Sequence, residues 1–183
     1  MNGEKLQTLA VLVDNESGVL SQVTRLFSRK GYNIESLAVG VTENPDTSRI
    51  TIEVSTDDNR LKLLANQLSK LIPVHCVRIL EPSTSIKREL VMIKVYAPAG
   101  EKRSEVMQIA NIFRASIIDV STTSLTLTLI GDDEKIEGLK NILEEFRILE
   151  LVRTGVIATE RGQTTIYDET KEKGEFNYGK NVL

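Results

Sequence analysis

The sequence predicts an α+β protein made of two tandem domains, each with the element order βαββαβ. The order appears twice along the 183 residues. In each series, some segments have strand character and others have apolar residues at the spacing of one helix face. The short polar stretch Pro82-Ser83-Thr84-Ser85 separates the two series. A chain of this length can form two small cores, and an open sheet with this order buries one face under two helices.

The first series predicts a domain over residues 5–81. LQTLAVLV at 6–13 has strand character, and from Val19 apolar residues recur at the spacing of one helix face. This helix is expected to end at Gly31, because glycine readily takes the left-handed conformation that closes helices.

A hairpin, a second helix and a last strand complete this domain. Residues 37–41 and 50–54 alternate apolar and polar side chains on either side of the turn ENPDTS. Asp57 or Asp58 can cap the next helix, whose apolar stripe ends before Pro73. VHCVRIL then supplies the fourth strand.

The second series predicts a domain over residues 87–161, after a linker at 82–86. Its elements are the strand ELVMIKVYA, a helix at 102–114, the strands ASIIDV and SLTLTLI, a helix at 133–146 and the strand ILELVRTGVIA. The two series share a pattern without sequence identity. Both predict a ferredoxin-like fold, with an antiparallel sheet and helices on one face.

From residue 162 to 183 the pattern fades into a polar, charged tail. One interpretation is a terminal segment without fixed structure. The other is a segment that docks on a partner or folds back through Ile166, Tyr167, Phe176 and Tyr178. The sequence leaves both open.

The composition argues against several classes of protein. With 40% hydrophobic residues, 27% charged residues and a net charge of -3, the chain is typical of a soluble globular protein. No segment reaches the roughly 20 apolar residues of a membrane span, and the start MNGEKLQ lacks the core of a signal peptide, so we expect a cytoplasmic protein. The basic residues are scattered, which argues against nucleic-acid binding.

No catalytic or metal-binding set is apparent. Cys76 has no second cysteine, and the single histidine, His75, lies in an ordinary strand, where a structural role is expected. Glycine-rich dinucleotide loops and Walker loops are absent from the sequence. The acidic pairs at 57–58, 132–133 and 144–145 fit helix ends. We therefore expect a protein without chemistry, metal or cofactor of its own.

DNESGVL at 14–20 is the stretch that points to function. Glycine at a strand-to-helix turn leaves the backbone open to a ligand, and amides at a helix start attract an anion such as a carboxylate. The structural alternative is that Ser17 caps the helix and Gly18 relieves a tight turn.

The pattern strand, N-x-x-G-x-L, helix and GYNIESL resembles the ACT domain, a regulatory module whose usual loop reads D-x-P-G-x-L. Here Asn15 replaces the Asp and Ser17 replaces the Pro. NESGVLSQVTRLFSRKGYNIESLAVGVTENPDTSRITIEV is similar to the start of the small, regulatory subunit of acetolactate synthase. KREL at 87–90, NIFRASIIDVS and LVRTGVIATERG resemble that family's C-terminal domain, so the likeness covers about residues 6–162.

The resemblance implies a non-catalytic subunit in branched-chain amino acid biosynthesis. Its partner would be a catalytic large subunit that uses thiamine diphosphate, Mg2+ and FAD. The small subunit would activate this partner and confer feedback inhibition by a branched-chain amino acid, most commonly valine, bound where two ACT domains pair as a homodimer. The alternatives are a free-standing ACT sensor that acts on another enzyme or a transcription system, and an independent small enzyme.

The resemblance also implies effector-binding residues. The effector's carboxylate would meet backbone amides near Gly18 and Val19, with polar contacts from two asparagines and apolar cover from Val39. The complete set carried over is Asn15, Gly18, Val19, Leu20, Asn33 and Ile34. The second repeat has APAGEKRSE in place of NESG and lacks GYN, so it is expected to keep the fold without this site and to contact the catalytic subunit or transmit the signal.

Overall fold

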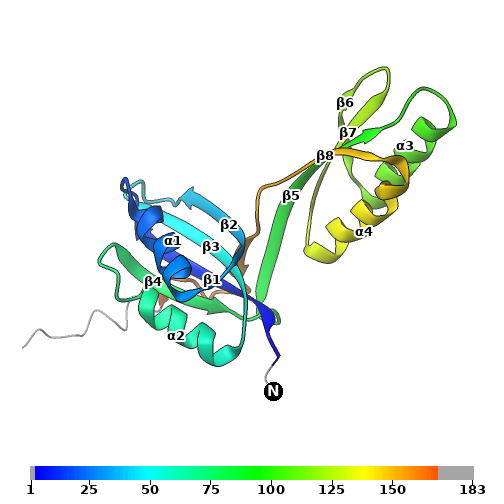
Figure 1. Cartoon of the computed structure of the whole chain (residues 1–183). Coiled ribbons are helices and arrows are strands. Elements are labelled where there is room, and N and C mark those ends of the chain that lie inside the picture. Colours follow the sequence, from blue (N-terminus) through cyan, green and yellow to red (C-terminus); the bar gives the residue numbers. More distant parts are fainter. Residues whose placement is uncertain (1–2, 169–183) are drawn as a thin grey trace, which may run out of the picture. The chain divides into compact units, whose positions relative to one another are not determined.

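A computed structural model describes residues 3–168 and divides the chain into two units (Figure 1). Of the described residues, the first unit comprises 3–86 together with 158–168, and the second is Lys87–Ile157. The chain therefore passes between the units twice. Residues 158–161, expected in the second domain, lie with the first unit, and the expected linker already contains the start of a strand at Ser85.

The first unit contains one four-stranded antiparallel sheet with two helices on one face (Figure 1). Its elements are β1 (Lys5–Asp14), α1 (Val19–Lys30), β2 (Ile34–Val41), β3 (Thr47–Thr56), α2 (Asp58–Leu68) and β4 (Val74–Leu80). The strand order is β2-β3-β1-β4, in which every neighbour runs antiparallel. This arrangement confirms the predicted ferredoxin-like fold.

The core of this unit lies between the sheet and the helices. Leu9 and Val11 of β1 pack with Phe27 of α1 and Leu64 of α2, and all four are buried. Gly31 ends α1 in the left-handed conformation, as predicted, with φ of 70°. Of the two candidate caps for α2, Asp57 takes the role, because its side chain accepts hydrogen bonds from the first-turn amides.

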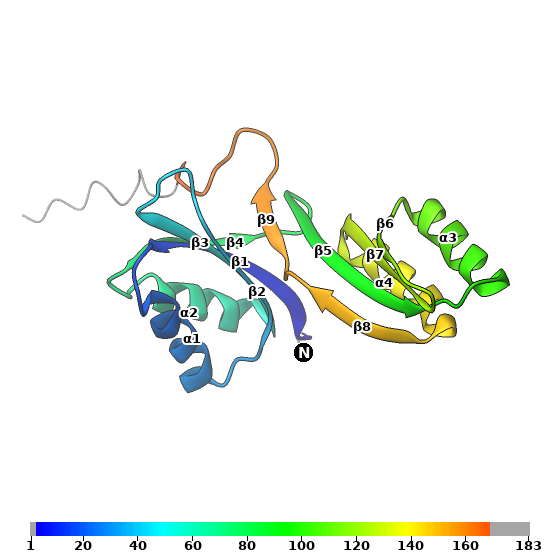
Figure 2. The same ribbon diagram turned by 90° about the horizontal axis from the view of Figure 1, so that it is seen from above.

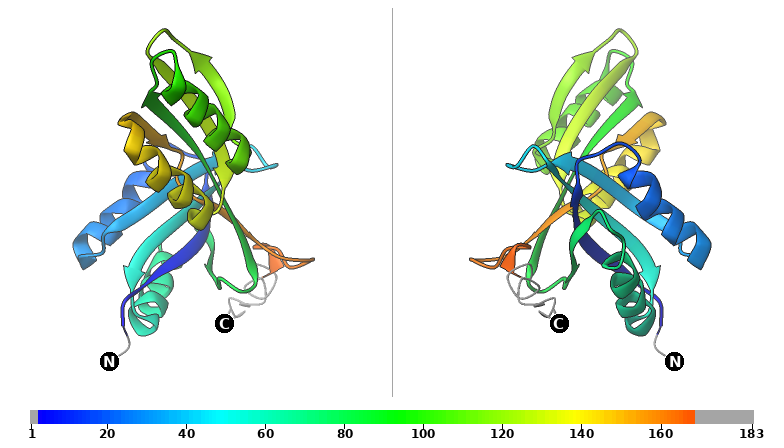
Figure 3. Two further views of the ribbon diagram at one scale, coloured as in Figure 1. Left: turned by 90° about the vertical axis from the view of Figure 1, so that its right-hand side faces the viewer. Right: turned by 90° about the vertical axis from the view of Figure 1, so that its left-hand side faces the viewer.

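The second unit repeats the plan with the strand order β6-β7-β5-β8 (Figure 3). Its elements are β5 (Ser85–Tyr96), α3 (Glu101–Phe113), β6 (Ser116–Val120), β7 (Ser124–Gly131), α4 (Asp133–Leu143), a 3-10 turn at Glu144–Phe146 and β8 (Ile148–Arg153). The helix predicted over 133–146 is thus α-helical only to Leu143. Leu125, Leu127 and Leu129 of β7 face a separate core, as their alternation with threonines predicts.

The final strand differs from the prediction. The sequence predicted one strand over 148–158, whereas the structure has β8 and then β9 (Ile157–Glu160), which pairs with β5 (Figure 2). Gly155 lies in the break with φ of 80°, a conformation that strands do not accommodate. Its backbone N–H donates to the Glu89 carboxylate at 3.0 Å, so a side chain replaces the interrupted strand pairing.

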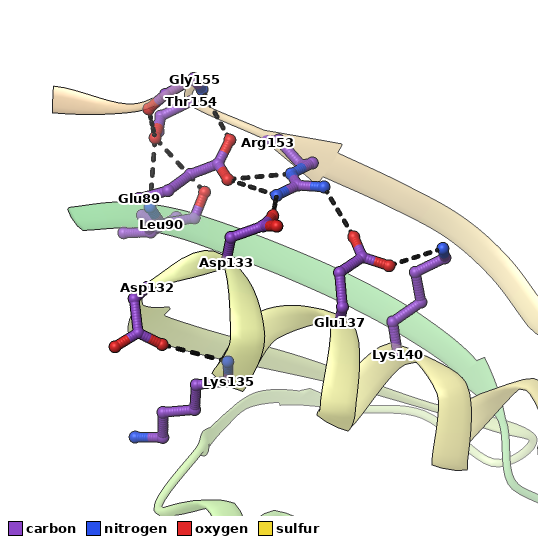
Figure 4. A network of polar contacts seen from close by, with 10 residues as sticks. All are labelled: Glu89, Leu90, Asp132, Asp133, Lys135, Glu137, Lys140, Arg153, Thr154 and Gly155. Atoms are coloured by element: carbon purple, nitrogen blue, oxygen red, sulfur yellow. Dashed lines mark hydrogen bonds and ion pairs between the residues drawn. The ribbon is translucent and has the colours of Figure 1, made fainter. Parts of the chain in front are cut away.

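Arg153, at the end of β8, joins three carboxylates (Figure 4). Its guanidinium donates to Glu89 at 2.6 and 2.9 Å, to Glu137 at 2.9 Å and to Asp133 at 3.2 Å. The Glu89 bond holds the pKa of Arg153 above its ordinary value, and Lys140 followed by Arg153 lowers the pKa of Glu137. Glu89 is only 5% exposed, so the guanidinium compensates the burial of its carboxylate.

Replacing Arg153 with Met should destabilise the second unit by about 3 kcal/mol, because it leaves the Glu89 charge buried without its cation. Lys94→Ala is the matched control: its contact with Glu150 joins the same two strands but is exposed, and should be worth less than about 1 kcal/mol. Urea unfolding of the full chain measures the loss of stability in each variant. Hydrogen exchange of the β8 amides then locates that loss in the second unit. An equal loss of unfolding free energy in the two variants would contradict a larger contribution from the buried Glu89–Arg153 pair.

Candidate functional site

Asn15 ties the loop between β1 and α1 to the turn between β2 and β3. Its side-chain Nδ2 donates to the carbonyl of Pro45 at 2.8 Å, and its Oδ1 accepts from the hydroxyl of Ser48 at 3.0 Å. Its backbone N–H donates to the carbonyl of Asp46 at 2.8 Å. Two of these hydrogen bonds hold the loop against the turn, and the third holds it to the start of β3.

The start of α1 has no side-chain cap. Gly18 is the N-cap residue with φ of 87°, so the suggestion that Ser17 caps the helix is wrong. The suggestion that Gly18 serves a tight turn is confirmed, because this φ is strained for residues with a Cβ. The first turn of α1 also contains no acidic side chain, which leaves its positive dipole end without a neutralising partner there.

The other four predicted site residues differ in exposure. Val19 is buried in the core, whereas Leu20 next to it is 40% exposed. Asn33 is exposed, and its Nδ2 donates to the Glu35 carboxylate at 2.9 Å. Ile34 is half-buried against the core.

The fold brings only part of the predicted set together. Asn15, Gly18, Val19 and Leu20 lie at the start of α1, but Asn33 and Ile34 follow its end. α1 has 12 residues, so about 18 Å of helix separates the two groups. The strand register agrees: Ile34 is opposite Val54, whereas Val41, at the other end of β2, is opposite Ser48, the partner of Asn15.

β2 is an edge strand of the first sheet, and its outer end is apolar. Val39 and Val41 are 48% and 59% exposed. An edge strand presents backbone donors and acceptors that another strand can pair with. The loop held by Asn15 and this apolar end of β2 are thus connected through the same turn.

The equivalent loops of the second unit are joined by a different residue. Arg103, in the first turns of α3, donates to the carbonyl of Ala97 at 3.0 and 2.7 Å, to Ser121 at 2.6 Å and to Thr122 at 2.8 Å. A guanidinium therefore fills the place where the first unit uses an uncharged amide. A cation at this place disfavours the ammonium group of an amino acid.

His75 Nε2 lies 2.7 Å from the carboxylate of Asp14, and both side chains are partly exposed. Among residues 3–168, no group of three or more His, Cys, Asp or Glu side chains is arranged to hold a metal ion. The helices within the same range are too short or too polar to cross a membrane.

Comparisons with known proteins agree for both units. A model of the AHAS small subunit-like ACT domain matches residues 9–76, and a model of the small subunit of acetolactate synthase matches residues 88–162. The chain is 47% identical over 158 residues to the probable acetolactate synthase small subunit of Methanothermobacter thermautotrophicus, covering 86% of this chain and 94% of the relative. The small subunit of Mycolicibacterium smegmatis is 47% identical over 161 residues, with 88% and 94% covered.

A solved structure gives the same result for the fold. The crystal structure of the acetolactate synthase small subunit from Thermotoga maritima matches with a TM-score of 0.80 and 34% identity. The match covers 87% of this chain and 99% of that one, so it includes both units.

Gly18→Ala should destabilise the first unit by about 1 to 2 kcal/mol, because alanine is strained at this positive φ. The added Cβ meets no atom within 4 Å, so a steric clash with neighbours does not contribute. Gly40→Ala is the control, because Gly40 also has open space but lies in β2 without a positive φ. Urea unfolding of both variants measures the difference. A Gly18→Ala protein as stable as the Gly40→Ala protein would contradict the backbone explanation.

Proposed function

This chain belongs to the family of acetolactate synthase small subunits, and on that premise we propose that it is the regulatory subunit of an acetolactate synthase. It has no active site of its own. It activates a catalytic large subunit, which holds thiamine diphosphate, Mg2+ and FAD, and it confers feedback inhibition by a branched-chain amino acid, most commonly valine.

The observation that carries the proposal is the uncapped start of α1 beside the loop held by Asn15. An amino acid presents a carboxylate, which suits backbone amides at a helix start, and an apolar side chain, which suits Leu20 and Val39. Burial of a valine side chain contributes roughly 1.5 to 3 kcal/mol, and each charged hydrogen bond adds a similar amount. Binding at metabolite concentrations is therefore reasonable.

A second copy of the chain would complete the site. If two β2 strands pair antiparallel about their centres, residue 34 of one copy lies opposite residue 41 of the other. The Asn33 end of one copy then approaches the Asn15 loop of its partner, which removes the separation imposed by α1. This geometry supports a homodimer through the first units, with the effector at the interface.

Mixing the purified chain with its large subunit should raise the rate of acetolactate formation, and added valine should lower the rate again. The physical reason is a coupling free energy, typically about 1 to 3 kcal/mol, between the effector site and the catalytic subunit. Product formation by the large subunit alone is the control. Amino-acid binding without any stimulation would favour the free-standing sensor instead.

Asn15→Ala and Asn33→Ala should each weaken effector binding about tenfold or more, because each removes a polar contact to a charged group. Calorimetric titration with valine, leucine and isoleucine measures this loss and ranks the effectors. One methylene changes discrimination by only about 1 to 3 kcal/mol, so the ranking depends on pocket shape. Asn66→Ala, an exposed asparagine of α2, is the matched control and should bind like the wild type.

A mixture of the two variant chains tests whether the site is shared. In a mixed dimer, the intact Asn15 of one copy meets the intact Asn33 of the other, so one site regains both side chains. In each mixed dimer, one of the two sites should therefore bind the effector as tightly as the wild type does. If both residues act within one copy, every site lacks one asparagine, and mixing restores nothing.

A further inference from the structure

Residues 158–168, which we call the strap, lie on the side of the first sheet opposite α1 and α2 (Figure 2), where they contact β3 and β4. The Arg49 guanidinium of β3 donates to the carbonyl of Ala158 at 2.7 Å. From β4, Arg78 donates to the carbonyl of Thr165 at 2.9 Å, and the Cys76 thiol donates to the carbonyl of Ile166 at 3.4 Å. The sheet thus anchors the strap at both of its ends.

An ion pair between these anchors and a tight turn at the end of the strap fix it further. Glu160 lies 2.9 Å from Nε of Arg78, and the two side chains are only 14% and 16% exposed. The Asp168 carboxylate accepts from the backbone N–H of Thr165 at 2.7 Å and from its hydroxyl at 3.1 Å. The folded-back alternative for the tail is therefore confirmed for Ile166, which is buried, while the predicted contacts of Phe176 and Tyr178 lie outside the described residues.

Tyr167, near the end of the strap, reaches the turn between β2 and β3. Its hydroxyl hydrogen-bonds the Glu43 carboxylate, which lowers the pKa of Glu43 and raises the pKa of Tyr167. Glu43 belongs to the turn whose later residues, Pro45 and Asp46, bond Asn15, which also bonds Ser48 at the start of β3. The turn is therefore held on one side by the loop between β1 and α1, residues 15–18, which we call the predicted effector loop, and on the other side by the strap.

We propose that the strap positions the predicted effector loop, and that effector binding and docking of the strap are coupled through the turn between β2 and β3. This inference rests on the proposed function. Tyr167 is the positioning residue, since it touches the turn and not the effector. The strap is continuous with the second unit through β9, so a change in its docking is a route by which the signal leaves the first unit.

The bonding of the strap suits this role. Its buried apolar side chains are Ala158 and Ile166, and its other anchors are hydrogen bonds and one ion pair. Segments with few apolar contacts open at lower free energy than a core. A ligand can therefore shift the strap while the sheet beneath it stays folded.

Tyr167→Phe removes the hydroxyl and keeps the ring, so it tests the proposal without a large packing change. Exchange of the Asn15 amide with solvent should accelerate in this variant, and its valine dissociation constant should rise about fivefold or more. Conversely, saturating valine should slow exchange of the Arg161 amide, which bonds the carbonyl of Thr84. Tyr96→Phe, a partly exposed tyrosine of β5, is the control and should change none of these.

Glu43→Gln provides a second variant from the other side of the contact. If Tyr167 and Glu43 act together, the double variant should weaken valine binding less than the product of the two single effects. Unchanged Asn15 exchange in Tyr167→Phe overturns the positioning role. If the wild-type chain binds valine and Tyr167→Phe binds it with the same affinity, the coupling is overturned. A wild-type chain that binds no branched-chain amino acid overturns the proposed effector function, while the exchange of Asn15 still decides whether the strap holds the turn.

Discussion

The placement of both helices on one face of each sheet is the constraint from which the other features follow. In the order βαββαβ, each helix connects strands that have one strand between them, and both crossovers fall on the same side. The opposite face and the two edge strands are then left for other segments to cover. In the first unit the strap lies on that face, and β2 remains an exposed edge with an apolar end. We therefore propose that the open face of the first sheet, with the strap on it, serves regulation, and that the exposed β2 edge serves assembly.

The two units show how one fold can treat the same loops differently. Asn15 joins its loop to the neighbouring turn with one amide and leaves the start of α1 uncapped. Arg103 joins the equivalent loops with a guanidinium that bonds three carbonyls. The amide leaves no net charge beside the helix start, whereas the guanidinium brings a permanent positive charge. The difference between the proposed ligand site in the first unit and the corner bonded by Arg103 in the second is therefore chemical, because the backbone plan is the same.

The strands and helices could be predicted because apolar spacing is a local property of the sequence. The alternation of Leu125 to Leu129 and the position of Gly31 both gave the observed elements. The break at Gly155 was missed because its hydrogen-bond partner, Glu89, lies 66 residues earlier. The strap was left open for the same reason, since nothing local to Ile166 reveals Cys76 as its neighbour. For the site, sequence patterns and the family resemblance only predict the residues, and the length of α1 shows that one copy separates Asn33 from Asn15.

The different bonding on the two sides of β9 gives the strap a defined direction of response. Before the break at Gly155, Arg153 is held by three carboxylates, one of them buried, so the end of β8 is costly to move. After β9, the strap is held mainly by polar contacts and ends at the turn that Asn15 also holds. A disturbance at the turn between β2 and β3 therefore meets the strap first and the end of β8 last. The end of β8 is bonded to α4 through Asp133 and Glu137, so in the proposed coupling α4 is the element that a displacement of β8 would reach.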